Sequence, residues 1–520
     1  MLISTQHRKV VLNVNNPDKI TTIIPTAKLL EFKGKTLVVV PHKDEETRVL
    51  RNLGYEVPAP IQHYYDWPGR FPPYIHQRET AAFLSGYPRS LCLNGMGSGK
   101  TISVLWAFDY LRRIGIARRM LVVAPLSTLE RTWGDEVFNN FPELTACVLH
   151  GTEAKRLKLI ATDFDVYIIN HDGIKNKRVL EALIKRTDID LIVPDEIASF
   201  RNASTDRWKS LNKLTKTRQF VWGLTGTPTP TAPTDVWAIV RLISPSKITG
   251  SFTAFRDKVM RKSGPYKWVA RDDAVRVVSE VMQPSIRFSR EDCIDLPPTT
   301  YLTRHAAMTE EQETMYKSMF AKLCAEYAEG KIMAVNKAVK AGKLLQIASG
   351  AVYNANHEAV FIPSAPRMEV TLELIQESDS KVIVFVPFTG ALTAVTEYLR
   401  KKGYSVENIH GQTSKAERDR IFSAFQKTAL PQILVANPGA MAHGLTLTAA
   451  STIIWFAPPM SNETYEQANA RIVRPGQKFN TRIAHIEGSL IERKAYERLQ
   501  HRGEMQDLLL ETLKDGGGLP

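Results

Sequence analysis

A glycine-rich stretch that follows an apolar run is the first feature of this 520-residue sequence that predicts chemistry. The run Ser90–Leu93 leads into Asn94-Gly95-Met96-Gly97-Ser98-Gly99-Lys100-Thr101, and the helix-forming stretch Ile102–Arg112 follows directly. Such a strand-to-helix turn lets backbone N–H groups converge on phosphate oxygens, and the helix N-terminus adds partial positive charge. We therefore expect Lys100 to reach the β- and γ-phosphates of a nucleotide and the Thr101 hydroxyl to hold Mg²⁺.

This match is shorter than the strict phosphate-loop pattern, which has glycine at the position of Asn94. The alternative is a glycine turn that caps a helix and leaves Lys100 in solvent. The apolar run before the loop and the helical stretch after it favour the phosphate site.

Two adjacent carboxylates follow another apolar run about ninety residues later. Leu191–Val193 is followed by Pro194, Asp195 and Glu196. We expect Asp195 to hold Mg²⁺, directly or through water, and Glu196 to polarise the attacking water. An acidic turn after a strand is common by itself. The prediction therefore depends on the position of this turn, about ninety residues after the glycine-rich loop.

Short apolar runs alternate with helical stretches in two blocks of the chain, and these elements must position the chemical groups. Runs this short and apolar are typical of strands buried on both faces of a parallel sheet. The first block has Ser90–Leu93, Met120–Ala124, Val166–Ile169, Leu191–Val193 and Phe220–Leu224, and the second has Val382–Val386, Gln432–Val435 and Thr452–Phe456.

The predicted organisation is therefore α/β, with a small α/β module at 1–70, a first lobe at 71–245, a helical insert and linker at 246–365, and a second lobe at 366–515. In the module, β-like runs cover Lys9–Val14, Ile20–Pro25 and Thr36–Pro41, and an amphipathic stretch covers Glu45–Leu53. The proline-rich passage Pro58–Pro73 is typical of a linker.

Composition narrows the class of protein. Hydrophobic residues make up 43% and charged residues 23%, as in soluble globular proteins. The four cysteines show no CxxC spacing, which disfavours a disulfide scaffold or a structural zinc site. No signal-peptide core and no apolar run of about 18 residues is present, so we expect a cytoplasmic protein. The 68 Lys and Arg against 54 Asp and Glu give +14, which favours an anionic partner such as nucleic acid over a basic protein without one.

A series of motifs in family order resembles the helicase superfamily two ATPases of the Swi/Snf type, in a compact bacterial or phage-like form. In the first block the similar segments are Tyr74–Gln77, Asn94–Thr101, Val122–Ser127 with Trp133 and Glu136, Asp195–Ala198 and Leu224–Pro228. In the second they are Val382–Phe388, His410-Gly411 with Arg418 and Phe425, Asn437–Leu447 and Gln467–Gln477, and the segments Asp295–Pro298 and Leu344–Ile347 resemble inter-lobe stretches. The ending Arg474-Pro475-Gly476-Gln477 is similar to the Swi/Snf branch rather than to RNA helicases.

The resemblance implies two RecA-like lobes that hydrolyse ATP with Mg²⁺ in the cleft between them. It implies that Gln77 recognises adenine, and that the nucleotide also contacts Gly95, Gly97, Ser98, Gly99, Lys100, Thr101 and Gly444. Arg471 and Arg474, at i and i+3 of a predicted helix, would neutralise charge on the γ-phosphate. Coupling would involve Thr225, Gly226, Thr227 and Gln467, and DNA phosphates would contact Pro125, Ser127, His410 and Gly439. The chain departs from the family at Ala198, where the DEAH histidine stands, and at Ala470, where glycine is usual.

The segment from Lys247 to Arg290 has ten Lys or Arg against four Asp or Glu, interleaved with Phe252, Phe255, Tyr266, Trp268 and Phe288. The basic residues suit phosphates, whereas the aromatic rings could stack on bases or pack in the core. The first 70 residues are loosely similar to the accessory module of annealing-helicase relatives, which recognises branched or fork DNA; the alternative is a small domain that braces the first lobe.

The leading hypothesis is an ATP-dependent double-stranded DNA translocase that remodels DNA or protein–DNA complexes. One alternative is an unwinding, branch-migrating or annealing helicase acting on forks, although no wedge hairpin or iron–sulfur cysteine set is visible. Another is a nucleotide-gated DNA-binding scaffold without turnover, for which Ala198 is the support. A nuclease-linked restriction motor is disfavoured, because no nuclease-like cluster of carboxylates and lysine is evident outside the motor.

Overall fold

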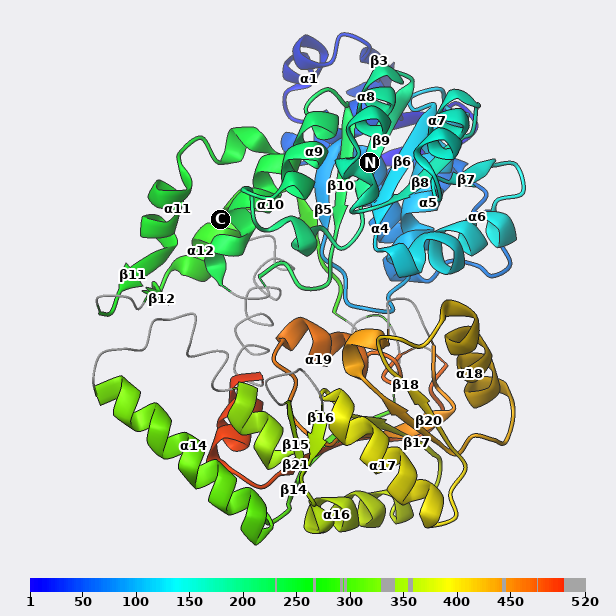
Figure 1. Ribbon diagram of the computed structural model, residues 1–520. Helices are drawn as coiled ribbons and strands as arrows, with labels where there is room; N and C mark the ends of the chain where they lie inside the picture. The colour runs from blue at the N-terminus through cyan, green and yellow to red at the C-terminus, as the bar shows by residue number, and fades with distance from the viewer. Residues whose placement is uncertain are drawn as a thin grey trace. The chain divides into compact units, whose positions relative to one another are not determined.

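The chain divides into two compact units in the computed structural model, Met1–Cys293 and Ile294–Asp507 (Figure 1). The structure describes residues 1–229, 232–264, 268–289, 293, 297–328, 342–353, 359–441, 446–474 and 476–499. Gly444, which we expected at the nucleotide, and Tyr266 lie outside these ranges. In the described ranges no helix is long and apolar enough to cross a membrane.

Unit 1 is built on a parallel sheet of seven strands with helices on both faces (Figure 1). The sheet order is β13 (Ser285–Ile286), β5 (Arg89–Cys92), β10 (Phe220–Leu224), β9 (Ile189–Pro194), β6 (Arg119–Ala124), β8 (Val166–Asn170) and β7 (Ala146–Val148). One core contains side chains of α4 (Ile75–Gly86), α5 (Lys100–Arg113) and α6 (Asp135–Asn140), and the other those of α7 (Glu153–Ala161), α8 (Lys177–Lys185), α9 (Asp206–Thr215) and α10 (Val236–Ile243). Burial from both sides explains why these strands are apolar throughout.

Unit 2 repeats this arrangement with six parallel strands. The order is β14 (Thr299–His305), β21 (Thr481–Glu487), β20 (Ala450–Trp455), β17 (Lys381–Phe385), β19 (Ile433–Ala436) and β18 (Val406–Ile409). Its helices include α16 (Ala365–Gln376), α17 (Thr389–Lys401), α18 (Lys415–Lys427) and α19 (Asn462–Asn469), and two cores fill the two faces of the sheet. The predicted α/β class with two RecA-like parallel-sheet lobes is confirmed.

The N-terminal module is an antiparallel sheet of four strands with its own core. Its strands are β1 (Leu2–Ser4), β2 (Lys9–Leu12), β3 (Lys28–Phe32) and β4 (Lys35–Pro41), and α2 (Asp44–Asn52) is the predicted amphipathic helix. The prediction of a strand at Ile20–Pro25 is wrong, because α1 (Pro17–Ile23) lies there. Asn16 caps this helix by accepting from the Lys19 N–H, and Pro17 stands in its first turn.

The proline-rich passage is not a free linker, because it packs on α5. It contains α3 (Ile61–Tyr64), and the Tyr65 hydroxyl donates to Asp109 Oδ2 at 2.6 Å. The Trp106 indole N–H donates to the Pro68 carbonyl at 2.7 Å. The Tyr110 hydroxyl, also on α5, donates to Asp44 Oδ2 of the module at 2.9 Å.

The stretch between the lobes contributes an edge strand to each sheet, β13 to unit 1 and β14 to unit 2, which the sequence pattern did not predict. It also contains α11 (Phe252–Val259), the hairpin of β11 (Met260–Lys262) and β12 (Trp268–Ala270), α12 (Ala274–Val281), α14 (Glu310–Ala328), β15 (Ala351–Tyr353) and β16 (Ala359–Phe361).

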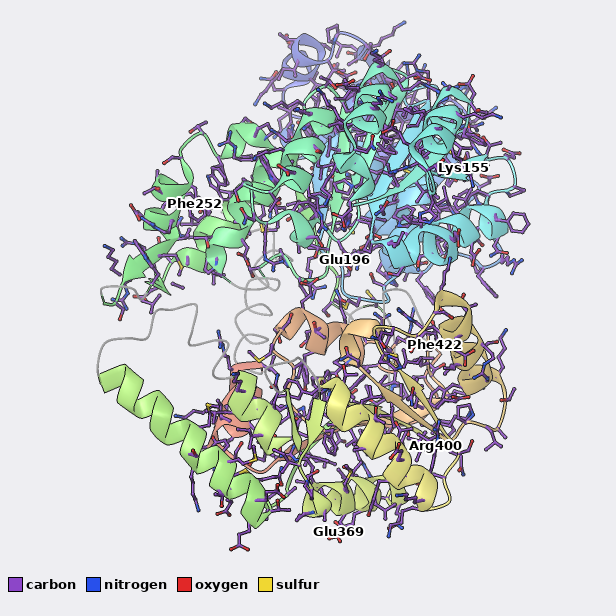
Figure 2. All side chains as sticks on the ribbon, in the orientation of Figure 1. Lys155, Glu196, Phe252, Glu369, Arg400 and Phe422 are labelled. Atoms are coloured by element: carbon purple, nitrogen blue, oxygen red, sulfur yellow. The ribbon has the colours of Figure 1, made fainter. Side chains whose placement is uncertain are left out.

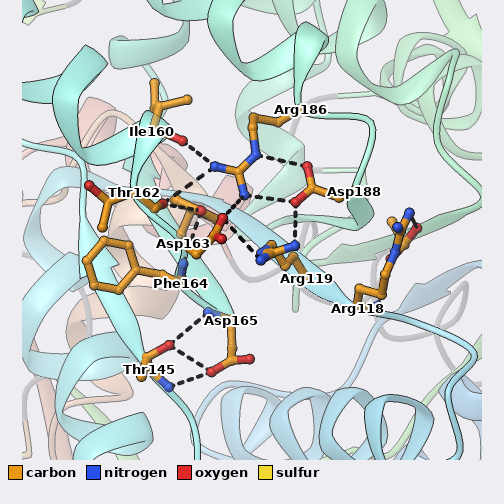
Figure 3. Close-up of polar contacts among 12 residues, drawn as sticks. Arg118, Arg119, Thr145, Ile160, Thr162, Asp163, Phe164, Asp165, Arg186 and Asp188 are labelled. Atoms are coloured by element: carbon orange, nitrogen blue, oxygen red, sulfur yellow. Dashed lines mark hydrogen bonds and ion pairs between the residues drawn. The ribbon is translucent and has the colours of Figure 1, made fainter.

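A charged network joins the amino-terminal ends of the central strands in unit 1 (Figure 3). The Arg186 guanidinium donates to both carboxylate oxygens of Asp188 at 2.8 Å and to Asp163 at 2.9 Å. Arg119 pairs with the same two carboxylates. These contacts hold the pKa of Asp188 at about 2, with the Arg186 hydrogen bonds as the largest cause. The network lies at the opposite ends of the strands from the phosphate loop and is therefore structural.

Candidate functional site

The glycine-rich loop joins β5 to α5, as the sequence predicts. Gly97 and Gly99 have φ of 80° and 79°, a region that favours glycine. Gly99 also lies so close to Gln77 that a Cβ there would be 2.2 Å from the Gln77 amide nitrogen. The Lys100 ammonium donates to the carbonyls of Asn94 and Gly95 at 2.9 and 3.1 Å, so its charge lies directly on the loop.

Asn94 stands at the first glycine position of the strict pattern, and its side chain joins the loop to Thr80 and Phe288. Its amide nitrogen donates to Thr80 Oγ1 of α4 at 2.8 Å, and its amide oxygen accepts from the Phe288 N–H at 2.9 Å. The Phe288 carbonyl in turn accepts from the Gly95 N–H at 2.9 Å. The side chain is buried, and glycine could make neither contact.

Two residues at the start of α4 bind the same carbonyl of the loop. The His76 Nε2 lies 2.9 Å from the Ser98 carbonyl oxygen, and the Gln77 amide nitrogen donates to that oxygen at 3.4 Å. Burial lowers the pKa of His76, which favours the neutral ring. Gln77 therefore lies beside the loop, while adenine recognition by its side chain stays a prediction.

Asp195 lies at the carboxyl end of β9, on the side of the sheet where the loop begins. Its Oδ2 accepts from the indole N–H of Trp133 at 2.9 Å, and its Oδ1 accepts from the Glu196 N–H at 3.0 Å. Burial raises the pKa of Asp195, and the nearby Lys100 charge and these hydrogen bonds oppose that rise. Trp133 comes from the π-helical segment Leu129–Gly134 and is fully buried.

Glu196 follows in a left-handed conformation, with φ of 49°, at the carboxyl end of β9 (Figure 2). Its Oε2 accepts from the Thr225 hydroxyl at 3.4 Å, and that hydroxyl accepts from the Thr227 N–H at 3.1 Å. Gly226 lies against the phosphate loop, since a Cβ there would be 3.5 Å from the Asn94 carbonyl oxygen. The segment after β10 therefore contacts both the loop and the carboxylate, whereas its coupling role stays a prediction.

His171 is a site residue that the sequence did not single out. It follows β8, and its Nε2 lies 2.8 Å from the Asp195 carbonyl oxygen. Burial lowers the pKa of His171 to about 4, so the ring is neutral at pH 7 and Nε2 is the donor. No spacing in the sequence connects it with Asp195, 24 residues away.

The two unit 1 positions expected at nucleic acid lie at the same sheet edge. Pro125 follows β6, and its carbonyl accepts from the Thr128 N–H at 3.0 Å and the Thr128 hydroxyl at 2.9 Å. This turn leaves Pro125 and Ser127 partly exposed. Their contact with phosphate stays a prediction.

In unit 2, Arg418 joins the two loops that hold the other expected contacts. Its guanidinium donates to the carbonyls of Thr413, Gly411 and Ala440 at 2.8, 3.3 and 3.4 Å. His410 is partly exposed in the first loop, and the exposed Gly439 in the second donates its N–H to Asn437 Oδ1 at 3.0 Å.

The predicted helix face of Arg471 and Arg474 is wrong, because α19 ends at Asn469 and both arginines lie in the turns that follow. Arg474 precedes Pro475, and a residue before proline is disfavoured in a helix. The Gln477 side chain also holds the turn by donating to the carbonyls of Ala450 and Ile472 at 2.8 and 3.3 Å. Gln467 lies on α19 and donates to Glu463 Oε1 at 3.2 Å.

Comparison with known proteins identifies both lobes. Residues 76–358 match the SNF2-related domain, and residues 366–476 match the helicase conserved C-terminal domain. The ISWI chromatin-remodeling complex ATPase CHR11 of Arabidopsis thaliana is 25% identical over 80% of this chain and 40% of its own length. Protein p41 of Acyrthosiphon pisum secondary endosymbiont phage 1 is 25% identical over 85% of this chain and 99% of its own.

A solved structure, the Sulfolobus solfataricus SWI2/SNF2 ATPase core in complex with dsDNA, is similar at 22% identity and a TM-score of 0.41, over 87% of this chain and 96% of that one. The chain spans less than half of the chromatin-remodeling relative and nearly all of the phage protein. Since the SNF2-related match covers more than half of the sequence, the chain belongs to the SNF2-related family of helicase-superfamily ATPases.

Proposed function

We propose that this chain hydrolyses ATP and uses the energy to move along double-stranded DNA, remodelling DNA or protein–DNA complexes. The observation that carries the proposal is the convergence of three groups at one edge of the unit 1 sheet. They are the loop with Lys100, the carboxylates Asp195 and Glu196, and Thr225, which hydrogen-bonds to Glu196.

The residues at this edge fit a magnesium ion. Mg²⁺ prefers hard oxygen donors, and the Thr101 hydroxyl and the Asp195 carboxylate supply them. Each Asp195 oxygen accepts one hydrogen bond and has capacity for another ligand. When bound, Mg²⁺ neutralises charge that develops on the phosphates.

The chain's own residues then have distinct tasks. The Lys100 ammonium exchanges loop carbonyls for phosphate oxygens when ATP binds, which keeps its charge paired in both states. Glu196 polarises the attacking water, and the Thr225 hydroxyl orients the Glu196 carboxylate. In the proposal Arg471 and Arg474 of unit 2 neutralise charge on the γ-phosphate, so that turnover requires the two units to close on DNA.

Duplex DNA is the proposed partner for two reasons. The net charge of +14 favours a polyanion, and one relative in the family is named for chromatin remodeling. A fork-acting helicase is a second candidate, because residues 1–57 form a separate module that is tied to α5 through Asp44 and Tyr110.

The test is the ATPase rate with duplex, single-stranded, forked and RNA ligands at one fixed salt concentration. We expect duplex to stimulate more than single strands or RNA, with little dependence on sequence, since phosphate contacts carry no base identity. Stimulation by single strands alone or RNA alone would overturn the proposal. A fork that stimulates more than plain duplex, with that preference lost on deletion of residues 1–70, would favour the second candidate.

A further inference from the structure

A basic arm extends from unit 1 between α10 and β13. We define the basic arm as α11, β11, β12 and α12, with described residues 252–264 and 268–281. In Figure 1 its hairpin lies far from the seven-stranded sheet. The described residues of the arm hold six cations and four carboxylates, and the charge is concentrated before Asp272: from Phe252 to Arg271 there are five cations, Arg256, Lys258, Arg261, Lys262 and Arg271, against Asp257.

Each described aromatic residue of the arm contacts another side chain of unit 1, although Phe252 is also 45% exposed. Phe255 is buried in the core of unit 1. Phe252 lies edge-on against Trp237, with ring centroids 5.6 Å apart at 82°. Trp268 is covered by the Arg256 guanidinium, whose carbon lies 3.9 Å from the ring centroid. Of the two roles expected for these rings, packing is the one that the geometry supports.

Two of the five cations serve the arm's own structure. Arg256 braces Trp268 and also donates to Asp257 Oδ1 at 2.8 Å. Arg271 Nε donates to the carbonyls of Asp257 and Met260 at 3.0 and 3.2 Å, which fastens the hairpin to the end of α11. These contacts hold the base of the hairpin in a defined place.

The other three cations, Lys258, Arg261 and Lys262, are exposed. Among the described residues, none of them forms an ion pair with a carboxylate. Lys262 stands opposite Trp268 in the hairpin, with its ammonium 5.8 Å from the ring centroid, and Arg261 is its neighbour on the same short strand. Like charges this close repel one another, and a polyanion bound to them relieves that repulsion.

We infer that the basic arm binds the phosphate backbone of duplex DNA through Lys258, Arg261 and Lys262, outside the helicase motifs. The inference rests on the proposed function, which supplies the duplex. It adds a contact site that the loops at the sheet edges do not include. Lys258, Arg261 and Lys262 offer charge alone, so the contact is with phosphates and is independent of sequence.

The test is the affinity of the full chain for a fluorescent duplex, measured by anisotropy across a salt series. The variant R261E/K262E should weaken binding by about tenfold at about 150 mM salt. The negative slope of log K against log salt should become shallower by about 2. Unfolding temperatures of the variant and the wild type are compared, because charge reversal could disturb the hairpin. If the variant is unstable, R261Q/K262Q removes the charge without adding repulsion and should still make the slope shallower by about 2.

The matched control is K155E/K158E on α7, which changes the net charge by the same amount. Both lysines are exposed, and α7 lies between β7 and β8, at the edge of the sheet opposite β13. Figure 2 shows Lys155 and Phe252 on opposite sides of unit 1. The control should keep wild-type affinity. Equal losses in the two double variants would mean a general effect of net charge and would overturn the inference.

Lysine acetylation gives a second readout that needs no variant. Saturating duplex should protect Lys258 and Lys262 from the reagent while Lys155 keeps its reactivity. The wild-type protein could bind duplex, with its ATPase stimulated, while the arm is not protected and R261E/K262E binds normally. That result would refute the role of the arm and leave the proposed function intact. If no nucleic acid binds the wild type or stimulates its ATPase, both the role of the arm and the proposed function are refuted.

Discussion

Replacing Trp133 by phenylalanine tests whether a buried indole positions the proposed magnesium ligand. The Trp133 N–H donates to Asp195 Oδ2 at 2.9 Å, and Asp195 is only 9% exposed. A hydrogen bond to a charged group contributes about 1.5–3 kcal/mol. Loss of a hydrogen-bond partner of a metal ligand costs about 10–100-fold in metal affinity or activity. We therefore expect kcat/KM for Mg-ATP to fall by about 10–100-fold, which corresponds to ~1.4–2.7 kcal/mol on the barrier.

Trp222→Phe is the matched control. Trp222 is fully buried in the same core, and its indole N–H donates at 3.1 Å to the Tyr87 carbonyl rather than to a carboxylate. Both substitutions remove one ring and one donor, so both should lower the unfolding temperature by similar amounts. The assay is steady-state ATPase over a range of Mg²⁺ concentrations. Activity of Trp133→Phe within about threefold of the control, or ~0.7 kcal/mol, would refute the positioning role.

Three further variants test the phosphate site, the arginine turn after α19 and the charged network of unit 1. Lys100→Ala should abolish ATP turnover and keep the fold, because in the described part of the chain the ammonium donates its hydrogen bonds to loop carbonyls rather than to the core; normal turnover in a folded variant, checked by circular dichroism, would contradict the phosphate site. Arg474→Ala should spare ATP binding and lower DNA-stimulated hydrolysis by about 10³-fold or more; equal loss of basal and stimulated rates with weaker ATP binding would make Arg474 a ground-state contact. Asp188→Asn should destabilise unit 1 by about 1 kcal/mol after allowance for solvent screening. Because the pKa of Asp188 falls from 3.8 to about 2 on folding, this difference should be constant above about pH 5 and shrink as the pH falls toward 2; in urea unfolding, a difference that grows on acidification would contradict it.

Much of the fold could be predicted because burial on both faces of a parallel sheet leaves a local signal. β6, β8 and β10 all lie where apolar runs stand in the sequence. The edge strands β13 and β14 lack that signal, since β13 has two residues and β14 is largely exposed. At α1 the β-branched residues suggested a strand, while the cap at Asn16 and the burial of Ile20 and Ile24 favour a helix.

The site was predictable to the extent that its groups are contiguous in sequence. The loop around Lys100 and the pair Asp195 and Glu196 each form one short segment at a strand end. The contacts of Trp133 and His171 with Asp195 span 62 and 24 residues and depend on strand order, which no local pattern encodes. The arginine turn after α19 likewise depends on Gln477 and on the end of β20.

The proposed function requires that ATP hydrolysis at Glu196 drives movement along duplex DNA. The most direct measurement is the release of a fluorescent third strand from a triplex, with the protein loaded on an adjoining stretch of plain duplex. We expect the wild-type protein with ATP to release the third strand. We expect no release by Glu196→Gln, which should still bind ATP while its turnover falls by orders of magnitude. Wild-type protein that hydrolyses ATP on this substrate and leaves the third strand bound, or a Glu196→Gln variant that releases it at the wild-type rate, would contradict the claim.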